Sequence, residues 1–215
     1  MYVPAHFAMP PEQVRAALDG VVAADLITPS ENGLVATFLP LLYDADRHAL
    51  LGHVARNNDH WRIADGAAES LVILRGPDHY ISPSWYPTKR EHGRVVPTWN
   101  YTTLHVHGRL VAHDDVKWLR ALVTRLTERQ ESGRPDRWHV TDAPERYIEG
   151  QLRAIVGLEL QISRVEAKAK LSQNRPAEDR TGVVAALARE PDPAAELLAE
   201  EMRALDRVPD GPVSP

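Results

Sequence analysis

The order of apolar and polar positions predicts a chain that begins with one helix and continues as a set of strands. Val14, Leu18 and Val21 recur at helical spacing after Pro10-Pro11, and this pattern ends near Thr28-Pro29-Ser30. From residue 33 onward the apolar runs become short and extended. These runs predict strands over residues 34–43, 50–54, 70–75 and 95–111.

The stretch 95–111 has the clearest strand pattern. Leu104, Val106 and Leu110 alternate with polar residues, which is the two-residue period of a strand with one buried face. The segment before it, residues 76–87, is rich in proline. We expect an ordered loop there, because proline favours extended or turn backbone and has no N–H to donate.

Two helices and a further strand are expected after that. An amphipathic helical pattern begins after Asp114-Asp115 and ends at Ser132-Gly133, and a shorter helix should follow Asp142-Ala143-Pro144. In the strand that comes next, the apolar positions change parity near Ser163-Arg164. The buried face must therefore switch through a bulge or bend at that point.

This order of elements predicts an α+β protein that is mainly β, an antiparallel barrel with helices packed over its gaps. Two further helices should be opened by Pro176 and by Asp192-Pro193. We expect a barrel domain over residues 1–190, followed by a C-terminal helix and tail over residues 191–215. The tail 209–215 has too little apolar surface to offset its ordering entropy, so we expect it to be mobile.

Composition narrows the chemistry that the chain can carry. It has 215 residues, 43% of them hydrophobic, and no apolar run approaches the roughly 18 residues of a membrane span. The first residues also lack the layout of a signal peptide, so the cytoplasm is the expected compartment. Because the chain has no cysteine, disulfides, thiolate metal sites and a cysteine nucleophile are excluded. A net charge of -5 gives no general attraction to nucleic acid.

Four patches of polar and aromatic residues carry the candidate chemistry, at 52–58, 80–87, 96–101 and 170–175. Together they supply cations, amides, hydroxyls and aromatic rings, which are the groups that hold a flat aromatic ligand with an anionic tail. The ligand that they suggest is a phosphorylated heterocycle.

Two of these patches offer groups that bind anions. Arg56 follows a strand and is flanked by histidine and asparagine side chains, which suits a phosphate, although an asparagine-rich surface turn explains the same residues. The patch 170–175 places Lys170 and Arg175 at the end of a strand and just before a helix. Anion binding and an ordinary polar connection are both open for it.

The other two patches are aromatic. The segment 82–86 combines two hydroxyls with two aromatic rings on a stiff loop, which would contact a ligand or anchor the loop to the core. On a strand, Trp99 and Tyr101 share one face, which we expect to be core. Thr98 and Asn100 share the opposite face, where they would read a ligand's heteroatoms or be solvated.

Two catalytic alternatives have weak support. His105 and His107 would share one strand face, as in metal sites of double-sheet barrels. The cupin pattern needs a glutamate four residues after the second histidine, however, and this chain has Val111 there, so we expect no metal. A Ser-His-Asp triad lacks a Gly-x-Ser-x-Gly elbow or any other signal that would place it.

Taken in order, these patches closely resemble the PaiB-type FMN-binding negative transcriptional regulator family. The resemblance runs from residue 1 to about residue 187 and is carried by five blocks: 36–42 (ATFLPLL), 52–57 (GHVARN), 76–77 (GP) with 80–86 (YISPSWY), 96–101 (VPTWNY) and 170–175 (KLSQNR). It implies a split β-barrel related to pyridoxamine-phosphate-oxidase-like proteins. It also implies a homodimer that binds FMN near the interface with residues of both subunits. The C-terminal helical extension expected after Asp192-Pro193 lies beyond the part that resembles the family.

The resemblance also implies a set of FMN contacts, and it does not identify a catalytic residue. The phosphate and ribityl chain would be contacted by His53, Arg56 and Asn57, and the adjoining loop would contribute Ser84, Trp85 and Tyr86. The flavin ring would be bordered by Trp99 and Asn100. The site would be closed by Lys170, Gln173 and Arg175, from the same or the partner chain.

The family name brings a role in transcription that the residues do not support by themselves. The helix after Asp115 carries Lys117, Arg120, Arg125 and Arg129, but no short helix and turn precede it, so a solvated face is favoured over a base-reading face. Repression through a partner or a metabolite is the alternative to direct DNA binding. Three classes stay open: an FMN-binding regulator, which we favour, an FMN-dependent oxidoreductase that uses NAD(P)H or another electron donor, and a cofactor-free binding module.

Overall fold

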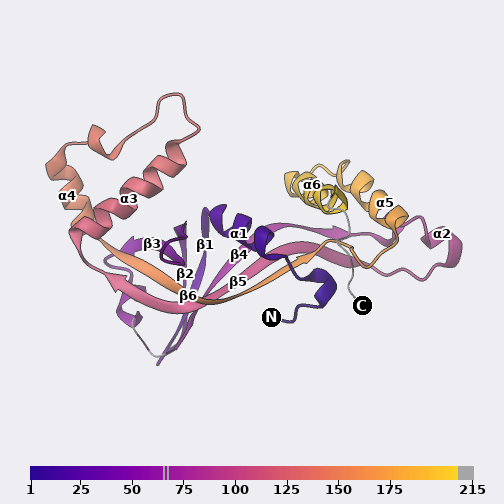
Figure 1. Ribbon diagram of the computed structural model, residues 1–215, viewed down its shortest axis with the longest axis horizontal. Coiled ribbons are helices and arrows are strands. Elements are labelled where there is room, and N and C mark those ends of the chain that lie inside the picture. Colours follow the sequence, from indigo (N-terminus) through magenta and orange to yellow (C-terminus); the bar gives the residue numbers. More distant parts are fainter. Residues whose placement is uncertain (65, 67, 208–215) are drawn as a thin grey trace. The chain divides into compact units, whose positions relative to one another are not determined.

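The computed structural model describes residues 1–64, 66 and 68–207 (Figure 1). The tail 209–215, which we expected to be mobile, lies outside the described residues. The described chain divides into two compact units. One unit comprises Pro11–Leu74 and His105–Glu166 and is called the barrel unit below, and the other comprises Met1–Pro10, Arg75–Leu104 and the residues from Ala167 onward and is called the C-terminal unit.

Within the described residues, six strands form one closed barrel in the order β1-β2-β3-β6-β5-β4. Their bounds are β1 (Ala23–Ser30), β2 (Gly33–Asp44), β3 (Ala49–Ala55), β4 (Ser70–Ile81), β5 (Thr98–His113) and β6 (Ile155–Lys170). The pairs β1–β2, β1–β4, β2–β3 and β3–β6 are antiparallel. The antiparallel barrel predicted from the sequence is therefore confirmed.

Helices and single 3₁₀ turns connect the strands (Figure 1). The helices are α1 (Pro11–Asp19), α2 (Lys89–His92), α3 (Val116–Glu131), α4 (Glu145–Arg153), α5 (Ala177–Leu187) and α6 (Pro193–Arg207), and the 3₁₀ turns are η1 (Ala5–Phe7), η2 (Asp59–Ile63), η3 (Pro83–Trp85) and η4 (Val140–Asp142). The predicted helices after residues 115, 144, 176 and 192 are all present. None of the helices in the described part of the chain is both long and apolar enough to cross a membrane.

The first helix is shorter than we predicted, and the strand that follows it was missed. Helix α1 ends at Asp19, and β1 occupies the segment that we took for the end of the helix. In β1 the buried positions Ala24, Leu26 and Thr28 alternate with more exposed ones, which is the period of a strand. The turn into β2 is completed by Gly33 at a φ of 107°, a left-handed conformation that favours glycine. Pairing with β2 thus overrides the weak helical pattern of this segment.

The prediction that residues 76–87 form a loop was also partly wrong. Strand β4 continues through it as far as Ile81, and the 3₁₀ turn and helix α2 follow. Strand β4 thus includes Pro77, and proline is tolerated in a strand where its missing N–H is not needed for pairing. A side chain at Gly76 would press on Thr102, with only 3.1 Å between the two Cβ atoms. The glycine thus permits close packing against β5.

Helix α3 covers the outer face of β2, β3 and β6 in the barrel unit. Its Leu122 and Leu126 pack on Leu42 and Leu51, and its Trp118 joins this cluster. The Asp115 side chain accepts a hydrogen bond of 2.8 Å from the Trp118 backbone N–H and so caps the helix. On its other side, α3 packs with α4 in a second apolar cluster.

The change of buried face that we predicted for the last strand is present in β6. Val156, Leu158 and Leu160 are buried in the barrel unit, whereas Ala167 and Ala169, at positions of the other parity, are buried in the C-terminal unit. The C-terminal unit has its own core, in which α5 and α6 lie side by side (Figure 1). Residues of β4, β6, α5 and α6 form this core, among them Ile81, Ala169, Leu171, Val183 and Met202.

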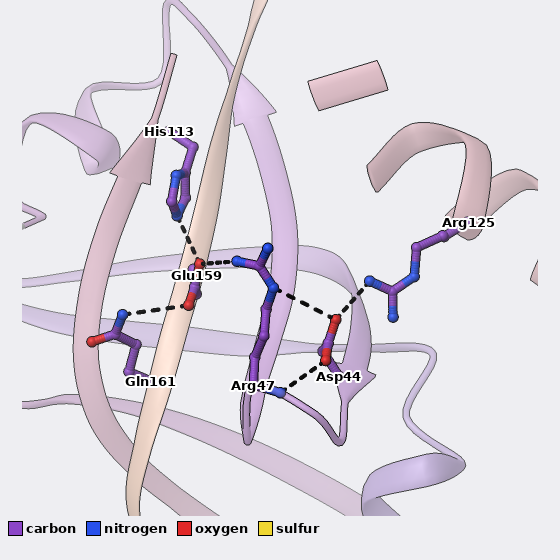
Figure 2. Close-up of polar contacts among 6 residues, drawn as sticks. All are labelled: Asp44, Arg47, His113, Arg125, Glu159 and Gln161. Atoms are coloured by element: carbon purple, nitrogen blue, oxygen red, sulfur yellow. Dashed lines mark hydrogen bonds and ion pairs between the residues drawn. The ribbon is translucent and has the colours of Figure 1, made fainter. Parts of the chain in front are cut away.

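Two buried carboxylates, Asp44 and Glu159, hold an ionic network in the barrel unit (Figure 2). Asp44 accepts hydrogen bonds from Arg125 Nη1 of α3 (2.7 Å) and from the Arg47 backbone N–H (3.0 Å). Glu159 accepts a bond of 2.8 Å from His113 Nε2 and pairs with Arg47 Nη1 at 3.5 Å. Arg47 therefore lies between both carboxylates and joins the turn after β2 to β6 and α3.

Replacing Gly157 tests the packing of α3. A Cβ at this position would overlap the Trp118 ring. We expect Gly157→Ala to lower the free energy of unfolding by about 2 kcal/mol, the usual cost of overpacking a filled site. Urea denaturation measures this, with Gly150→Ala as the matched control, because Gly150 has open space around it and alanine favours its helix by up to about 1 kcal/mol. Equal stability of Gly157→Ala and the unmodified protein would contradict the packing described.

Low pH should reduce the free energy of unfolding, because it protonates the Asp44 carboxylate. Burial raises the pKa of Asp44, but the hydrogen bonds from Arg125 and Arg47 outweigh this, so the pKa lies below its ordinary value. The stabilisation is therefore present above the ordinary carboxyl pKa of about 4 and is lost as pH falls through the lower folded-state value. Asp44→Asn should remove about 2 kcal/mol at neutral pH and flatten the acid-side loss of stability.

Urea denaturation at neutral pH and at about pH 3 measures both effects of Asp44→Asn. Asp46→Asn, at an exposed position of the same turn, is the control. Parallel loss of stability with acid in Asp44→Asn and in the unmodified protein would show that Asp44 is not the titrating group.

Candidate functional site

The predicted FMN contacts are divided between the two units. The barrel unit holds His53 at the end of β3, and Arg56 and Asn57 in the loop that follows. The C-terminal unit holds the remaining predicted contacts, which are Ser84, Trp85, Tyr86, Trp99, Asn100, Lys170, Gln173 and Arg175.

The turn that follows β6 in the C-terminal unit has an unusual backbone. Ser172 has a φ of 66°, the left-handed region that side chains other than glycine rarely adopt. Asn100 Nδ2 donates a bond of 2.9 Å to Ser172 Oγ, and Gln173 Oε1 accepts one of 2.7 Å from the Leu171 backbone N–H. Asn100 and Gln173 therefore hold the turn in a strained shape, which is a common property of ligand-binding sites.

Two cations, Lys170 at the end of β6 and Arg175 in the turn that follows, have no acidic partner among the described residues. Lys170 Nζ donates to the Trp99 carbonyl (2.6 Å) and to Thr98 Oγ1. The Arg175 guanidinium lies 4.9 Å from the centroid of the Tyr86 ring. Among the residues that the structure describes, no carboxylate forms an ion pair with Lys170 or Arg175. Burial lowers the pKa of Lys170, and the positive charges of Lys168 and Arg175 lower it further.

Tyr86 adds an unsatisfied polar atom beside these cations. Its side chain is 2% exposed, and its hydroxyl makes no hydrogen bond of ordinary geometry among the described residues, although Ser172 and Arg175 lie near enough to lower its pKa. Burial raises the pKa of Tyr86, and the nearby charge of Arg175 offsets part of this rise. Because a buried hydroxyl without a partner is costly, this position suits a ligand group or a water molecule.

The aromatic residues of the C-terminal unit have mixed roles. Trp85 packs against the core of the unit, and the exposed Ser84 accepts a bond of 3.0 Å from Lys89 Nζ. Trp99 is 48% exposed, whereas Asn100 is fully buried, so our expectation that the aromatic face of this strand is core was wrong. The polar face can be buried because Ser172 satisfies the Asn100 amide.

Arg56, which we expected to contact a phosphate, is held by the barrel unit itself. It donates to both carboxylate oxygens of Asp114, to the Arg153 carbonyl (2.8 Å) and to the Ile155 carbonyl (3.1 Å). These contacts use four of the five N–H groups of a guanidinium. The hydrogen bond from Arg56 also lowers the pKa of Asp114. The geometry shows a link between β3, the residues after β5 and the start of β6.

The other residues of this patch differ in their surroundings. Asn57 is exposed, and the Asn58 side chain caps the turn after it by accepting from the His60 backbone N–H at 3.0 Å. His53 Nδ1 is buried and has no hydrogen-bond partner among the described residues. Burial lowers the pKa of His53, which favours the neutral ring.

A His-His-Glu cluster that the sequence pattern missed lies in the barrel unit. His105, His107 and Glu166 offer ligand atoms within 4.8 Å of one another, and the glutamate comes from the neighbouring strand rather than from position 111. Arg164 Nη2 donates to His107 Nδ1 at 2.9 Å, which places the proton of a neutral ring on Nε2. This N–H faces Glu166 Oε2 at 3.7 Å. This separation is longer than a hydrogen bond, and His107 Nε2 is buried without a hydrogen-bond partner among the described residues.

Comparison with known proteins identifies relatives along most of the chain. A family model described as "Putative FMN-binding domain" matches residues 1–164. The Bacillus subtilis (strain 168) protein named Protease synthase and sporulation protein PAI 2 is 31% identical over 207 residues, which cover 94% of this chain and 96% of that protein.

Solved structures share the fold at low sequence identity. The flavocytochrome Anf3 from Azotobacter vinelandii has a TM-score of 0.60 at 14% identity, over 84% of this chain and 78% of its own. The FAD and heme binding protein from Mycobacterium smegmatis has a TM-score of 0.57 at 19% identity, over 80% of this chain and 77% of its own. These likenesses agree with the split β-barrel, and the family match establishes FMN as the cofactor. The chain belongs to the PaiB-type family of FMN-binding proteins.

Proposed function

We propose that the protein is a cytoplasmic, homodimeric regulator of the PaiB type that holds the FMN phosphate at Lys170 and Arg175. The observation that carries this proposal is the pair of cations without an acidic partner among the described residues. A phosphate dianion would supply the missing negative charge, and arginine matches its oxygens with a planar fork of donors. The unsatisfied Tyr86 hydroxyl adds a donor next to Arg175.

Lys170 and Arg175 are better placed for this role than Arg56. The Arg56 guanidinium is already neutralised by Asp114, so an approaching phosphate would meet a carboxylate. We therefore propose that the phosphate contact lies at Lys170 and Arg175. The exposed Trp99 ring and the loop residues Ser84 and Trp85 are the proposed partners of the flavin ring and ribityl chain, with Asn100 and Gln173 shaping the turn.

Arginine variants distinguish these two positions. Arg175→Ala should weaken FMN binding by about 2 kcal/mol, which is roughly a 30-fold rise in Kd, because it removes a charge-assisted contact. Arg90→Ala removes an exposed cation of the same unit and should leave the Kd unchanged. Flavin fluorescence titration measures the Kd, and a yellow colour with a flavin absorption band in freshly purified protein is the first test of the cofactor itself.

Arg56→Ala completes this comparison. We expect it to lower stability while the FMN affinity stays close to that of the unmodified protein, since Arg56 bonds Asp114 and two backbone carbonyls. If Arg56→Ala weakens FMN and Arg175→Ala does not, the proposed position of the phosphate is wrong.

An exposed apolar sheet face supports the homodimer. On the outer side of β2, Leu34 is 75% exposed and Phe38 is 70% exposed. Ala36 lies between them on the same face and pairs with Ile27 of β1. Contiguous apolar surface of this kind on a folded protein marks an interaction site. A second copy of the chain is the proposed partner, because a two-fold interface can bury the same face on both subunits.

A charge on this face should break the dimer. Phe38→Glu places an unpaired carboxylate in the proposed interface, and we expect at least a tenfold rise in the dimer dissociation constant. Sedimentation velocity over a concentration series measures it. Leu197→Glu, at a half-exposed apolar position of α6, is the matched control and should leave the dimer intact. A monomeric unmodified protein at micromolar concentration would contradict the proposal, and so would a fully dimeric Phe38→Glu.

The basic residues of α3 favour an indirect regulatory role. Arg120 pairs with Glu145, Arg125 pairs with Asp44, and Arg129 donates to the Asp19 carbonyl. Three of the four cations of α3 are occupied in this way, which leaves Lys117, and a helix with one such cation is poorly suited to reading bases in a DNA groove. We therefore propose that regulation proceeds through another macromolecule that responds to the flavin-loaded dimer.

A further inference from the structure

A cavity of about 370 Å³ lies in the barrel unit behind His53. It is lined by residues of β3, α3, η4, α4 and the start of β6. Its volume falls in the range of small-molecule pockets, and it exceeds the roughly 150 Å³ of an engineered cavity that binds benzene. There is therefore room for a molecule of about two fused rings.

Apolar and aromatic side chains make up most of the wall. Val140, Ile148 and Leu152 belong to the buried cluster between α3 and α4 and also line the cavity. Trp138 and Tyr147 line it as well, yet 45% and 59% of their surfaces stay exposed. Two large rings at the edge of a cavity are typical of sites that hold a flat aromatic molecule.

The polar groups in the wall are all uncharged at neutral pH. They are the His53 ring, the Thr127 hydroxyl and the Gln151 amide, together with the polar ends of Trp138 and Tyr147. Among the described residues, no lysine, arginine, aspartate or glutamate lines the cavity. Entry of an anion or cation would thus remove its charge from water without a counter-charge in return.

His53 provides the second, independent observation. Its Nδ1 is buried and lacks a hydrogen-bond partner among the described residues. Leu51, two positions earlier on the same face of β3, packs under α3. The histidine is thus a polar group on an otherwise apolar strand face, next to a cavity that would admit its partner.

We propose that this cavity binds a neutral, planar, two-ring aromatic molecule with a polar group on one edge, which hydrogen-bonds to His53. Neither Lys170 nor Arg175 is among the described residues that line the cavity, and the proposal stands whether or not these two residues bind phosphate.

Calorimetric titration of the full-length protein with 2-naphthol tests the proposal. We expect one saturable site, and we expect naphthalene-2-sulfonate, which has the same rings and a negative charge, to bind at least tenfold more weakly. His53→Phe keeps a ring of similar shape and removes the nitrogens, so the 2-naphthol Kd should rise by about threefold to tenfold.

Filling the cavity should abolish binding of 2-naphthol. Thr127→Trp places a large ring in the cavity from α3, and Gln151→Trp does so from the exposed side of α4, where a folding defect is not expected. Glu128→Trp, at the adjacent exposed position of α3, is the matched control and should bind as the unmodified protein does. Circular dichroism and FMN affinity, both expected to be unchanged, show that each variant is folded.

The outcomes separate this site from the flavin site. Saturating FMN should leave the 2-naphthol affinity unchanged. The proposal is overturned if FMN displaces 2-naphthol, if the sulfonate binds as well as the neutral compound, or if folded Thr127→Trp and Gln151→Trp both retain full affinity.

Discussion

The antiparallel pairing of β3 with β6 is the interaction on which the barrel unit depends. It sets Leu51 opposite Glu159 and His53 opposite Gly157, so two strands that are distant in sequence each place two residues on one outer face of the sheet. Helix α3 can lie on this face because Gly157 leaves room for Trp118. The same helix reaches Asp44 through Arg125, and His113, stacked on Trp118 at 4.1 Å, bonds Glu159. Apolar packing and charge pairing thus both hold α3 on the outer face of β3 and β6.

Arginines in both units pair with carboxylates, and Lys170 and Arg175 differ from them, which supports the proposed position of the phosphate. In the barrel unit Arg47, Arg56 and Arg125 each pair with a carboxylate. Such pairs are satisfied within the protein and gain little from a further anion. In the C-terminal unit, Lys170 and Arg175 have like charges near each other, and no carboxylate of the described residues forms an ion pair with either of them. The ligand-free protein therefore carries an electrostatic cost at this turn that a bound phosphate would remove.

Sequence patterns predicted the elements whose signal is local. The helix capped by Asp115 and the parity change in β6 follow from spacing within one segment, and both are present. Strand β1 was missed because its residues match a weak helical pattern, and only pairing with β2 decides the outcome. The pairing of Arg56 with Asp114 could not be predicted from the sequence, for the same reason. Asp114 lies far along the chain, and the fold alone brings the two together.

The exposed face of Trp99 shows a related limit. Alternation along a strand correctly separated Trp99 from Asn100, but it does not say which of the two faces is buried. Hydrophobicity favoured the aromatic face, whereas the structure buries Asn100 because Ser172 satisfies its amide. A buried polar side chain of this kind depends on a partner from a distant segment, which no local pattern contains.

Strain and charge in the turn after β6 would act together on the proposed binding of a phosphate. Ser172 adopts a left-handed backbone that costs free energy, and Asn100 and Gln173 hold it there through hydrogen bonds. Because these bonds fix the turn in advance, an anion would meet Lys170 and Arg175 without first ordering the backbone. The cost of bringing two positive charges together is likewise met during folding. Binding of a phosphate would relieve part of the repulsion between the two cations. The ligand-bound protein should therefore have a larger free energy of unfolding than the ligand-free protein.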